Sequence, residues 1–250
     1  MHVFDAGLYQ LILLIMLLTA PLVFVVLFYV SAPYGRHTRG GWGMCFSNRI
    51  GWLVMESPAC LLVLVLVVLF ADLNLPILVM LLIWQSHYVY RAFVYPFSLK
   101  ENRNMPVSVI GMALVFNSAN AYLIAGHFAF HTYSDAWFVS PAFLLGTMLF
   151  FAGMLITRLS DRTLRQLSED NQGYNIPAGG MYQLISCPNY LGEIIQWLGW
   201  AVLTWSTAGF VFLIWTMANL IPRAVEHHRW YQQQFPDYPK NRKAIIPYVW

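Results

Sequence analysis

Glu56 is the residue of this sequence best placed for chemistry, because it is an ionisable group inside a long apolar segment. It lies in Trp52-Leu-Val-Met-Glu-Ser-Pro-Ala, about 6 Å along a helix from Trp52, and Pro58 follows within one turn. A proline bends a helix and opens space beside a carboxyl group. A charge at the centre of a bilayer costs about 2.5–3.5 kcal/mol and usually faces a cavity or a partner. Glu56 therefore indicates a functional site, with a salt bridge to a neighbouring Arg as the structural alternative.

His87, Tyr88 and Tyr90 lie near the end of another apolar segment, in Gln85-Ser-His-Tyr-Val-Tyr-Arg-Ala-Phe. Tyr and His at such a position commonly form a belt at the membrane interface. A tyrosyl hydroxyl beside a carboxyl group in an apolar pocket can instead donate a hydrogen bond to a carbonyl oxygen that becomes an enolate. The combination of Glu56 with Tyr88 suits the polarisation of a carbonyl group.

A second set of polar residues lies in the C-terminal half. In Cys187-Pro-Asn-Tyr-Leu-Gly-Glu, Asn189 could cap a helix, and Glu193 begins an inward stripe that Gln196 and Trp197 continue. Arg223, His227 and Tyr231 follow at i, i+4 and i+8, on one face of a later helix. These residues predict a polar wall.

Metal and nucleotide motifs are weak in this chain. His227 and His228 point to different faces of a helix, and no second ligand cluster stands near them in the sequence, so we expect no metal site. Gly179-Gly180 predicts a turn and not a phosphate-binding loop. The net charge of +3 has no nucleic-acid-binding pattern.

The composition and the apolar runs of the chain indicate which elements position these residues. The chain of 250 residues is 59% hydrophobic and only 10% charged, which indicates an integral membrane protein. A spanning helix needs about 20 apolar residues. Seven segments meet or approach that length: 8–30, 52–71, 75–97, 107–130, 141–159, 190–205 and 208–225, the last two reading as a tight helical hairpin. The expected fold is an all-α bundle of seven transmembrane helices.

Charge predicts the orientation of this bundle. All 14 Lys and Arg residues follow the first, third, fifth and seventh segments or end them, whereas Asp5, Asp72 and Asp135 mark the opposite side. Because cytoplasmic loops collect basic residues, the N-terminus is predicted outside and the C-terminus in the cytoplasm. The first segment lacks the basic start of a cleavable signal peptide and is expected to be retained.

The chain is expected to form a single domain over residues 1–250, with two polar cytoplasmic stretches at 158–189 and 226–250. The first stretch is predicted to continue the fifth helix past the membrane, with Asp161 and Arg165 four residues apart on one face. An ordinary solvated ion pair would explain that spacing too. Together, the stretches could cover a site on the cytoplasmic side.

Several blocks in order resemble the steroid 5α-reductases (3-oxo-5α-steroid 4-dehydrogenases), and the similarity covers nearly the whole chain. They are Pro33-Tyr-Gly-Arg-His-Thr, Glu56, His87-Tyr88, the stretch that starts at Asn175-Ile-Pro-Ala-Gly-Gly and includes Asn189-Tyr-Leu-Gly-Glu193, and the ending Asp237-Tyr-Pro-Lys-Asn-Arg-Lys-Ala-Ile-Ile-Pro. The resemblance implies a seven-helix bundle that encloses NADPH, reached from the cytoplasm, beside a Δ4-3-oxosteroid. A compact, even bacterial, member would fit the short chain, and the membrane would be a bacterial inner membrane or the endoplasmic reticulum.

The resemblance also implies roles for individual residues. Glu56 and Tyr88 would hold the 3-oxo group of the substrate, with Trp52 and Trp197 nearby, while hydride goes to the β-carbon and a proton to the α-carbon. Glu56 would either donate a hydrogen bond in its protonated form or accept one from Tyr88. The cofactor pocket, built mainly from residues 158–250, would include Tyr34, Asn102, Arg103, Asp161, Arg165, Tyr174, Asn189, Glu193, Arg223, His227 and Tyr231. Met105 and Ser168 stand where relatives often have basic residues near the cofactor phosphates. The preference for NADPH over NADH is therefore left open.

Other functions remain as alternatives. A membrane methyltransferase of the isoprenylcysteine type would bind S-adenosylmethionine in a similar C-terminal hairpin, but it would leave Glu56 and Tyr88 without a role. Sterol C14 or C7 reductases usually have more helices. A small transporter or sensor could use Glu56 as a proton or cation site, although the sequence has no internal repeat. The protein is expected to act as a monomer.

Overall fold

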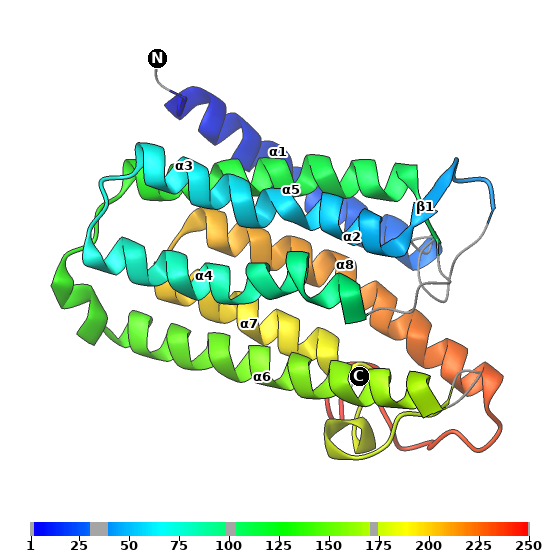
Figure 1. Cartoon of the computed structure of the whole chain (residues 1–250). Coiled ribbons are helices and arrows are strands. Elements are labelled where there is room, and N and C mark those ends of the chain that lie inside the picture. The colour runs from blue at the N-terminus through cyan, green and yellow to red at the C-terminus, as the bar shows by residue number, and fades with distance from the viewer. Residues whose placement is uncertain (1–2, 31–39, 99–103, 171–174, 250) are drawn as a thin grey trace. The chain divides into compact units, whose positions relative to one another are not determined.

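The computed structural model describes residues 3–30, 40–98, 104–170 and 175–249, with the side chains of 168–170 excluded. Its contacts divide the chain into two units. Unit 1 comprises Met1–Leu17 and Ala32–Ser140, and unit 2 comprises Leu18–Ser31 and Pro141–Trp250. The described residues are mainly α-helical, and Figure 1 shows the course of each helix.

The α-helices and short strands follow the order of the predicted segments. They are α1 (Ala6–Tyr29), β1 (Cys45–Ser47), α2 (Asn48–Ser57), the π-helical turn η2 (Pro58–Leu62), α3 (Val63–Phe70), α4 (Leu75–Phe93), η3 (Tyr95–Ser98), β2 (Asn104–Pro106), α5 (Val107–Phe130), η4 (Asp135–Val139), α6 (Pro141–Asp170), η5 (Gly180–Gln183), α7 (Pro188–Thr204) and α8 (Thr207–Gln234). Helix α6 runs to Asp170, which confirms the predicted extension of the fifth segment.

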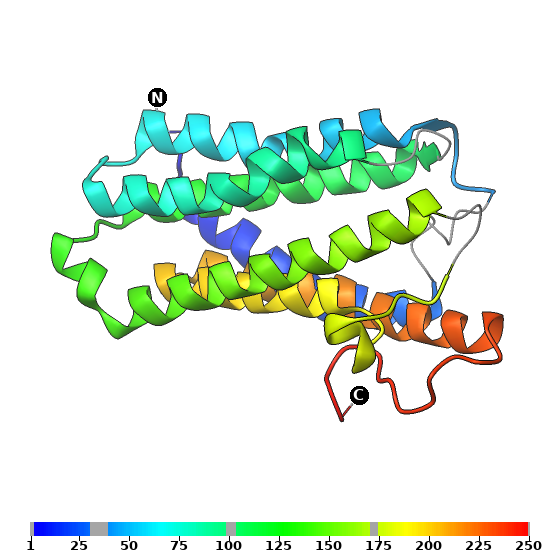
Figure 2. The same cartoon turned by 60° about the horizontal axis from the view of Figure 1, so that its bottom comes forward.

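In unit 1, the continuous helix α2–η2–α3 packs against both α4 and α5, and the three lie side by side in Figures 1 and 2. The antiparallel pair β1–β2 joins the start of α2 to the start of α5, with Phe46 opposite Met105. The beginning of α1 packs on α5 through aromatic rings, because Gly126 leaves room for Tyr9 and Phe4.

In unit 2, α6 and α7 run in opposite directions with their backbones in contact. Gly146 and Gly153 of α6 are seven residues apart, or two helical turns, and so are Gly192 and Gly199 of α7. A Cβ atom on any of these glycines would overlap the backbone of the opposite helix. Small residues at such spacing are the usual means of close helix packing in membranes. We call these four residues the glycine ladder.

A tight turn joins α7 to α8, as the sequence predicted. Trp205 ends α7 with a left-handed backbone (φ 47°), and the Ser206 hydroxyl caps α8 by accepting a hydrogen bond from the Gly209 amide at 3.0 Å. The two helices therefore pack against each other as a hairpin.

Five helical segments of the described chain are long and apolar enough to cross a membrane, which supports an all-α membrane protein. They are Ala6–Tyr29, Asn48–Phe70, Val107–Phe130, Pro141–Leu167 and Thr207–Gln234. Helices α4 and α7 coincide with the other two predicted segments but are shorter, with 19 and 17 residues. The seven-span count, the single domain and the orientation therefore stay predictions.

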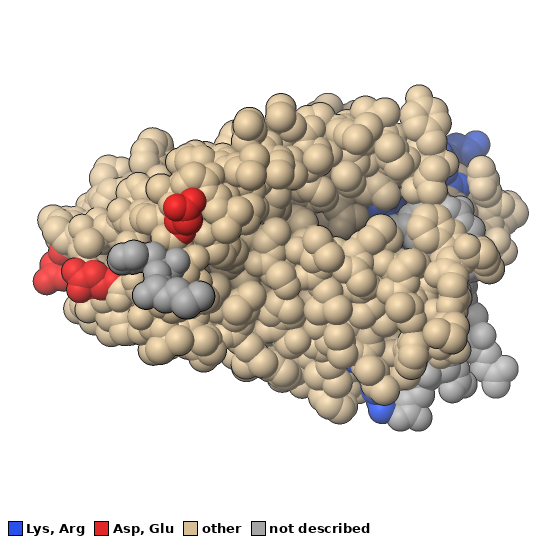
Figure 3. Space-filling model, turned by 90° about the horizontal axis from the view of Figure 1, so that it is seen from above, with Lys and Arg blue, Asp and Glu red and all other residues tan. Residues whose placement is uncertain are grey.

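The charged residues of unit 1 separate as the sequence predicted. Asp5 precedes α1, Asp72 follows α3, and Asp135 begins η4, so all three lie where helices of unit 1 begin or end on the same side. The face drawn in Figure 3 has its acidic side chains at one end and basic side chains towards the other. This separation underlies the predicted orientation in a membrane.

Candidate active site

The carboxyl group of Glu56 in α2 forms an ion pair with Arg91 in α4. The Nε–Oε1 distance is 3.7 Å, and the side chains of Arg91 and Glu56 are only 19% and 13% exposed. The Arg91 guanidinium also lies 4.4 Å from the centre of the Trp52 ring. The salt bridge considered as the structural alternative for Glu56 is thus confirmed. Sequence reasoning assigned Arg91 only to the topology, although its position one turn after Tyr88 was a usable signal.

Tyr88 is buried on the face of α4 that meets the helix of Glu56. Its ring stacks on Trp84 at 4.7 Å and meets the ring of His87 edge-on at 4.9 Å. Trp84 and Arg91 lie one turn before and after Tyr88, and both contact the helix that contains Glu56. Burial of His87 and Tyr88 does not fit a belt exposed to lipid. The structure therefore brings Trp52, Glu56 and Tyr88 to facing surfaces of α2 and α4.

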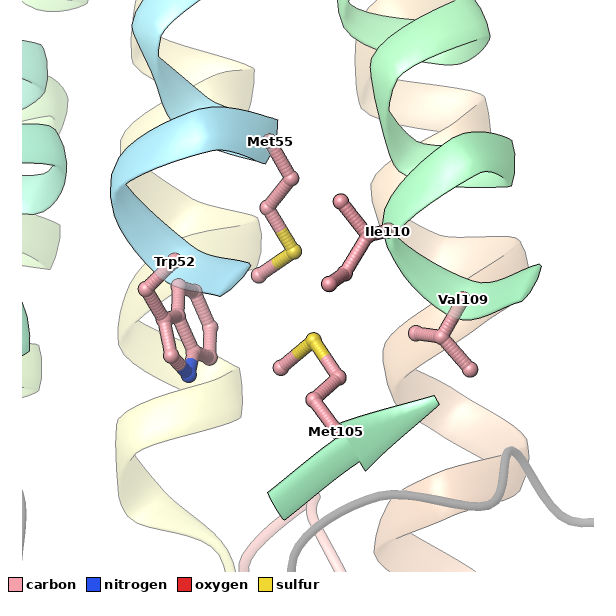
Figure 4. Packing of buried hydrophobic residues seen from close by; sticks show 5 residues of the cluster. All are labelled: Trp52, Met55, Met105, Val109 and Ile110. Carbon is pink, nitrogen blue, oxygen red and sulfur yellow. The ribbon is translucent and has the colours of Figure 1, made fainter. Parts of the chain in front are cut away.

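Trp52 also packs into an apolar cluster at the start of the span (Figure 4). Its partners Met55, Met105, Val109 and Ile110 come from α2, β2 and α5. Met105 is fully buried there. The residue that stands where relatives often have a basic side chain is therefore a core residue in this protein.

In unit 2, Arg223 of α8 is one of the predicted polar residues. It is buried, with only 9% of its surface exposed. Its Nε donates a hydrogen bond to the hydroxyl of Tyr190 in α7 at 2.9 Å. One turn later His227 packs on the Tyr190 ring, with centroids 5.6 Å apart, and its Nδ1 lies 3.9 Å from the Cys187 sulfur. Tyr190 was missed as a site residue, although it lies inside the motif quoted from the sequence.

Asp161 and Asn189 are brought together across the α6–α7 contact. The Asn189 amide donates to the Asp161 carboxylate at 3.2 Å, and the Asn189 carbonyl accepts from Thr157 at 3.2 Å. Helix α7 begins after Cys187 with Pro188 in its first turn, and no side chain caps it. The alternative that Asn189 caps this helix is therefore wrong, because Asn189 is the second residue of α7 and Cys187 stands at the N-cap position. Arg165 and Glu193 are half-buried, and each lies one turn further along its own helix. Because α6 and α7 are antiparallel, they lie on opposite sides of the Asn189–Asp161 contact.

Tyr231 lies one turn after His227 on the same face of α8. Its ring stacks on the ring of Tyr238, with centroids 5.4 Å apart and nearly parallel planes. Burial raises the pKa of Tyr238, so this phenol stays neutral at physiological pH. The Ser186 hydroxyl lies 2.6 Å from both the Tyr238 hydroxyl and His228 Nδ1, and Arg242 donates to the Pro177 carbonyl at 3.0 Å. These contacts tie the two predicted polar stretches together.

Gly179 and Gly180, both with positive φ, turn the chain at the start of η5, as predicted. The Tyr182 hydroxyl in η5 donates to the Ser160 carbonyl at 3.3 Å. Burial, with Asp161 nearby, raises the pKa of Tyr182 well above its usual range. Within the described ranges, no three His, Cys, Asp or Glu side chains gather to hold a metal.

The remaining predicted residues are distributed as follows. Trp197 is buried in unit 2 between Phe150 and Phe212, at centroid distances of 6.0 and 4.6 Å, so it belongs to a different unit from Trp52. Four predicted cofactor residues lie outside the described residues: Tyr34, Asn102, Arg103 and Tyr174. Their roles stay predictions.

Comparison with known proteins agrees with the resemblance seen in the sequence. The family profile of 3-oxo-5-alpha-steroid 4-dehydrogenase matches residues 103–250. The chain is 40% identical to steroid 5-alpha-reductase DET2 of Arabidopsis thaliana, with 98% of each chain covered. It is 36% identical to 3-oxo-5-alpha-steroid 4-dehydrogenase 1 of Bos taurus, over 90% of this chain and 91% of the bovine one. The matching enzyme of Homo sapiens is also 36% identical, over 88% and 86%. The protein therefore belongs to the steroid 5α-reductase family.

Proposed function

We propose that this protein reduces the Δ4 double bond of 3-oxo-Δ4-steroids to 5α-dihydro-3-oxosteroids, with NADPH as the reductant. The names of its relatives describe that reaction, and they are similar over nearly the whole chain. The observation that carries the proposal is a carboxylate, a guanidinium and a buried tyrosine on facing surfaces of two helices inside an apolar unit. That arrangement suits stabilisation of negative charge on a carbonyl oxygen.

The reaction adds hydride to the β-carbon of the enone and moves the π electrons onto the 3-oxo oxygen. The α-carbon then takes a proton from water, which completes the saturated ketone. Tyr88 donates a hydrogen bond to the oxygen as its charge grows, and such a donor stabilises the enolate more than the ketone. Two roles for Glu56 come from the sequence, and the Arg91 ion pair favours the second. Before the steroid binds, an ionised Glu56 accepts the hydrogen bond from the single O–H of Tyr88 and so orients it, and this O–H then turns to the 3-oxo oxygen.

The donor set of unit 2 fits a phosphorylated dinucleotide. A buried guanidinium at Arg223 suits an anionic oxygen, while the amide of Asn189 and the hydroxyl of Tyr190 suit neutral polar groups. Asp161, Arg165, Glu193, His227 and Tyr231 complete the set of described residues that would hold the cofactor. When bound, NADPH supplies the hydride.

Reduction by purified protein in detergent or nanodiscs tests this function. Testosterone or progesterone should be converted to the 5α-dihydro product with one NADPH consumed per steroid, and product stereochemistry should be assigned by chromatography against 5α and 5β standards. NADH in place of NADPH measures the cofactor preference. Binding of S-adenosylmethionine without binding of NADPH would point to the methyltransferase alternative. Binding of neither would reopen the transporter or sensor alternative.

Replacement of Arg223 by Met is expected to raise the KM for NADPH by roughly tenfold to 100-fold, because a hydrogen bond to a charged group contributes about 1.5–3 kcal/mol. The kcat at saturating NADPH should change much less. Initial rates at varied NADPH and saturating steroid measure both constants.

Arg229→Met is the matched control, because Arg229 is an exposed arginine on the same helix. It should leave the KM for NADPH unchanged. An equal rise in both variants would mean that only the overall positive charge matters, and no rise in Arg223→Met would remove Arg223 from the cofactor site.

The membrane arrangement forms part of the same proposal. We propose seven spans in one domain, with α4 and α7 completing the bundle, the N-terminus outside and the C-terminus in the cytoplasm. The protein would work as a monomer in a bacterial inner membrane or in the endoplasmic reticulum. The one-sided distribution of Lys and Arg supports the orientation.

A further inference from the structure

The helix that carries Glu56 is interrupted two residues later by the π-helical turn η2, Pro58–Leu62. Pro58 has no N–H, so the carbonyl of Val54 loses its α-helical donor. The Ser57 hydroxyl replaces that donor, at 3.0 Å from the Val54 oxygen. Inside a bilayer, an unsatisfied carbonyl costs several kcal/mol, so such an interruption persists only where side chains supply hydrogen bonds.

Side chains from two neighbouring helices bind the carbonyls on either side of Glu56. Asn117 of α5 donates to the Met55 carbonyl at 2.6 Å, and the indole N–H of Trp84 in α4 donates to the Ala59 carbonyl at 2.7 Å. Gln85 donates to the Cys60 carbonyl at 2.9 Å and accepts from the Cys60 thiol at 3.0 Å. These bonds fix the axial position of Glu56 against both α4 and α5.

Trp84 connects this network to Tyr88. It is fully buried, and the ring whose N–H binds the Ala59 carbonyl stacks on the Tyr88 ring one turn later, at 4.7 Å and an interplanar angle of 29°. A displacement of the π-helical turn would therefore move Trp84 and, with it, Tyr88. One side chain thus joins the two residues that the proposed function places at the 3-oxo group.

We propose that Trp84 is a positioning residue, which sets the placement of Tyr88 relative to Glu56 by bridging the Ala59 carbonyl and the Tyr88 ring. The proposal rests on the reductase function above. π-Helical turns are frequent at functional sites, and an error of about 1 Å in a catalytic group can cost 10²-fold in rate. Gln85 and Asn117 support the same turn without touching Tyr88 in the contacts given above.

The test compares Trp84→Phe, which keeps an aromatic ring beside Tyr88 but removes the indole donor, with wild type in nanodiscs. The expected result is a fall in kcat of about tenfold to 100-fold, an unchanged KM for NADPH, and a fold that is retained at the assay temperature. Ser86→Ala is the matched control, because Ser86 lies on the exposed side of α4 and bonds only within its own helix in the contact given, to Ile83 at 2.6 Å. It should change neither constant.

A double-mutant cycle separates positioning from mere support of the fold. If Trp84 acts through Tyr88, Trp84→Phe should cost less than about twofold in a Tyr88→Phe background, because residues that act as a unit are not additive. Independent, multiplying losses would overturn the proposal, as would a lowered melting temperature with unchanged kcat. Should Trp84→Phe fail to fold, Trp84→Tyr, which fills more of the indole's space but also lacks the indole N–H, replaces it in the cycle. An inactive wild type with intact NADPH binding would instead refute the proposed function.

Discussion

Replacement of Glu56 by Gln is expected to lower kcat for steroid reduction by about 10²- to 10³-fold, with little change in the KM for NADPH. The amide has the size of the carboxyl group, so the space that the side chain fills is unchanged, but it cannot form the ion pair with Arg91. A buried guanidinium would then lack its carboxylate, and Tyr88 would lose a charged acceptor. Steady-state kinetics with saturating NADPH, together with NADPH titration, measure both parameters.

The same substitution distinguishes the two roles of Glu56. A glutamine can donate a hydrogen bond to a ketone, so a Glu56 that works as a protonated donor should tolerate the change with only a small loss of kcat. An ionised Glu56 that orients Tyr88 should not. Asp72→Asn, an acid-to-amide change in an exposed loop of the same unit, is the control and should leave kcat and the KM for NADPH unchanged. Activity close to that of wild type in Glu56→Gln would refute the acceptor role.

Replacement of Gly153 or Gly199 by Ala is expected to prevent stable folding of unit 2. The added Cβ would overlap the backbone of Gln196 or Phe150, and a backbone cannot turn aside as a side chain can. Ordinary overpacking costs about 1–3 kcal/mol, and a backbone overlap costs more because both helices must separate. Separation of α6 from α7 would also break the Asn189–Asp161 hydrogen bond. Yield of monodisperse protein and the melting temperature in detergent, followed through exposure of the buried Cys187 thiol, report the loss.

Gly111→Ala provides the comparison, since it is also a glycine within a helix but has no atom within 4 Å of an added Cβ. Alanine is the better helix former by roughly 0.5–1 kcal/mol, so this variant should be neutral or slightly more stable. Similar melting temperatures for Gly111→Ala and Gly153→Ala would show that the glycine ladder does not control the packing of α6 and α7.

The sequence by itself determined the helices and the family. Long apolar runs cannot leave their backbone polar groups unpaired in lipid, so seven helical segments could be placed, including Val107–Phe130 without error. The segment 208–225 ended too early, because α8 continues through polar residues to Gln234. Pro58 and the Gly179-Gly180 pair marked an interruption and a turn because both residue types restrict the backbone in known ways. Charged and hydroxyl-bearing residues within such segments are costly, which is why Glu56 and Tyr88 stood out before any contact was known.

Only the tertiary structure decided which of these groups meet. The pairing of Glu56 with Arg91, the hold of Asp161 on Asn189, and the burial of Met105 each join residues from separate helices or strands. Such contacts depend on the axial register and rotation of one helix against another, and a shift of one residue turns a side chain by about 100°. That register is set by packing details, such as the glycine ladder in unit 2 and the bonds from Trp84, Gln85 and Asn117 in unit 1, which no local sequence pattern specifies.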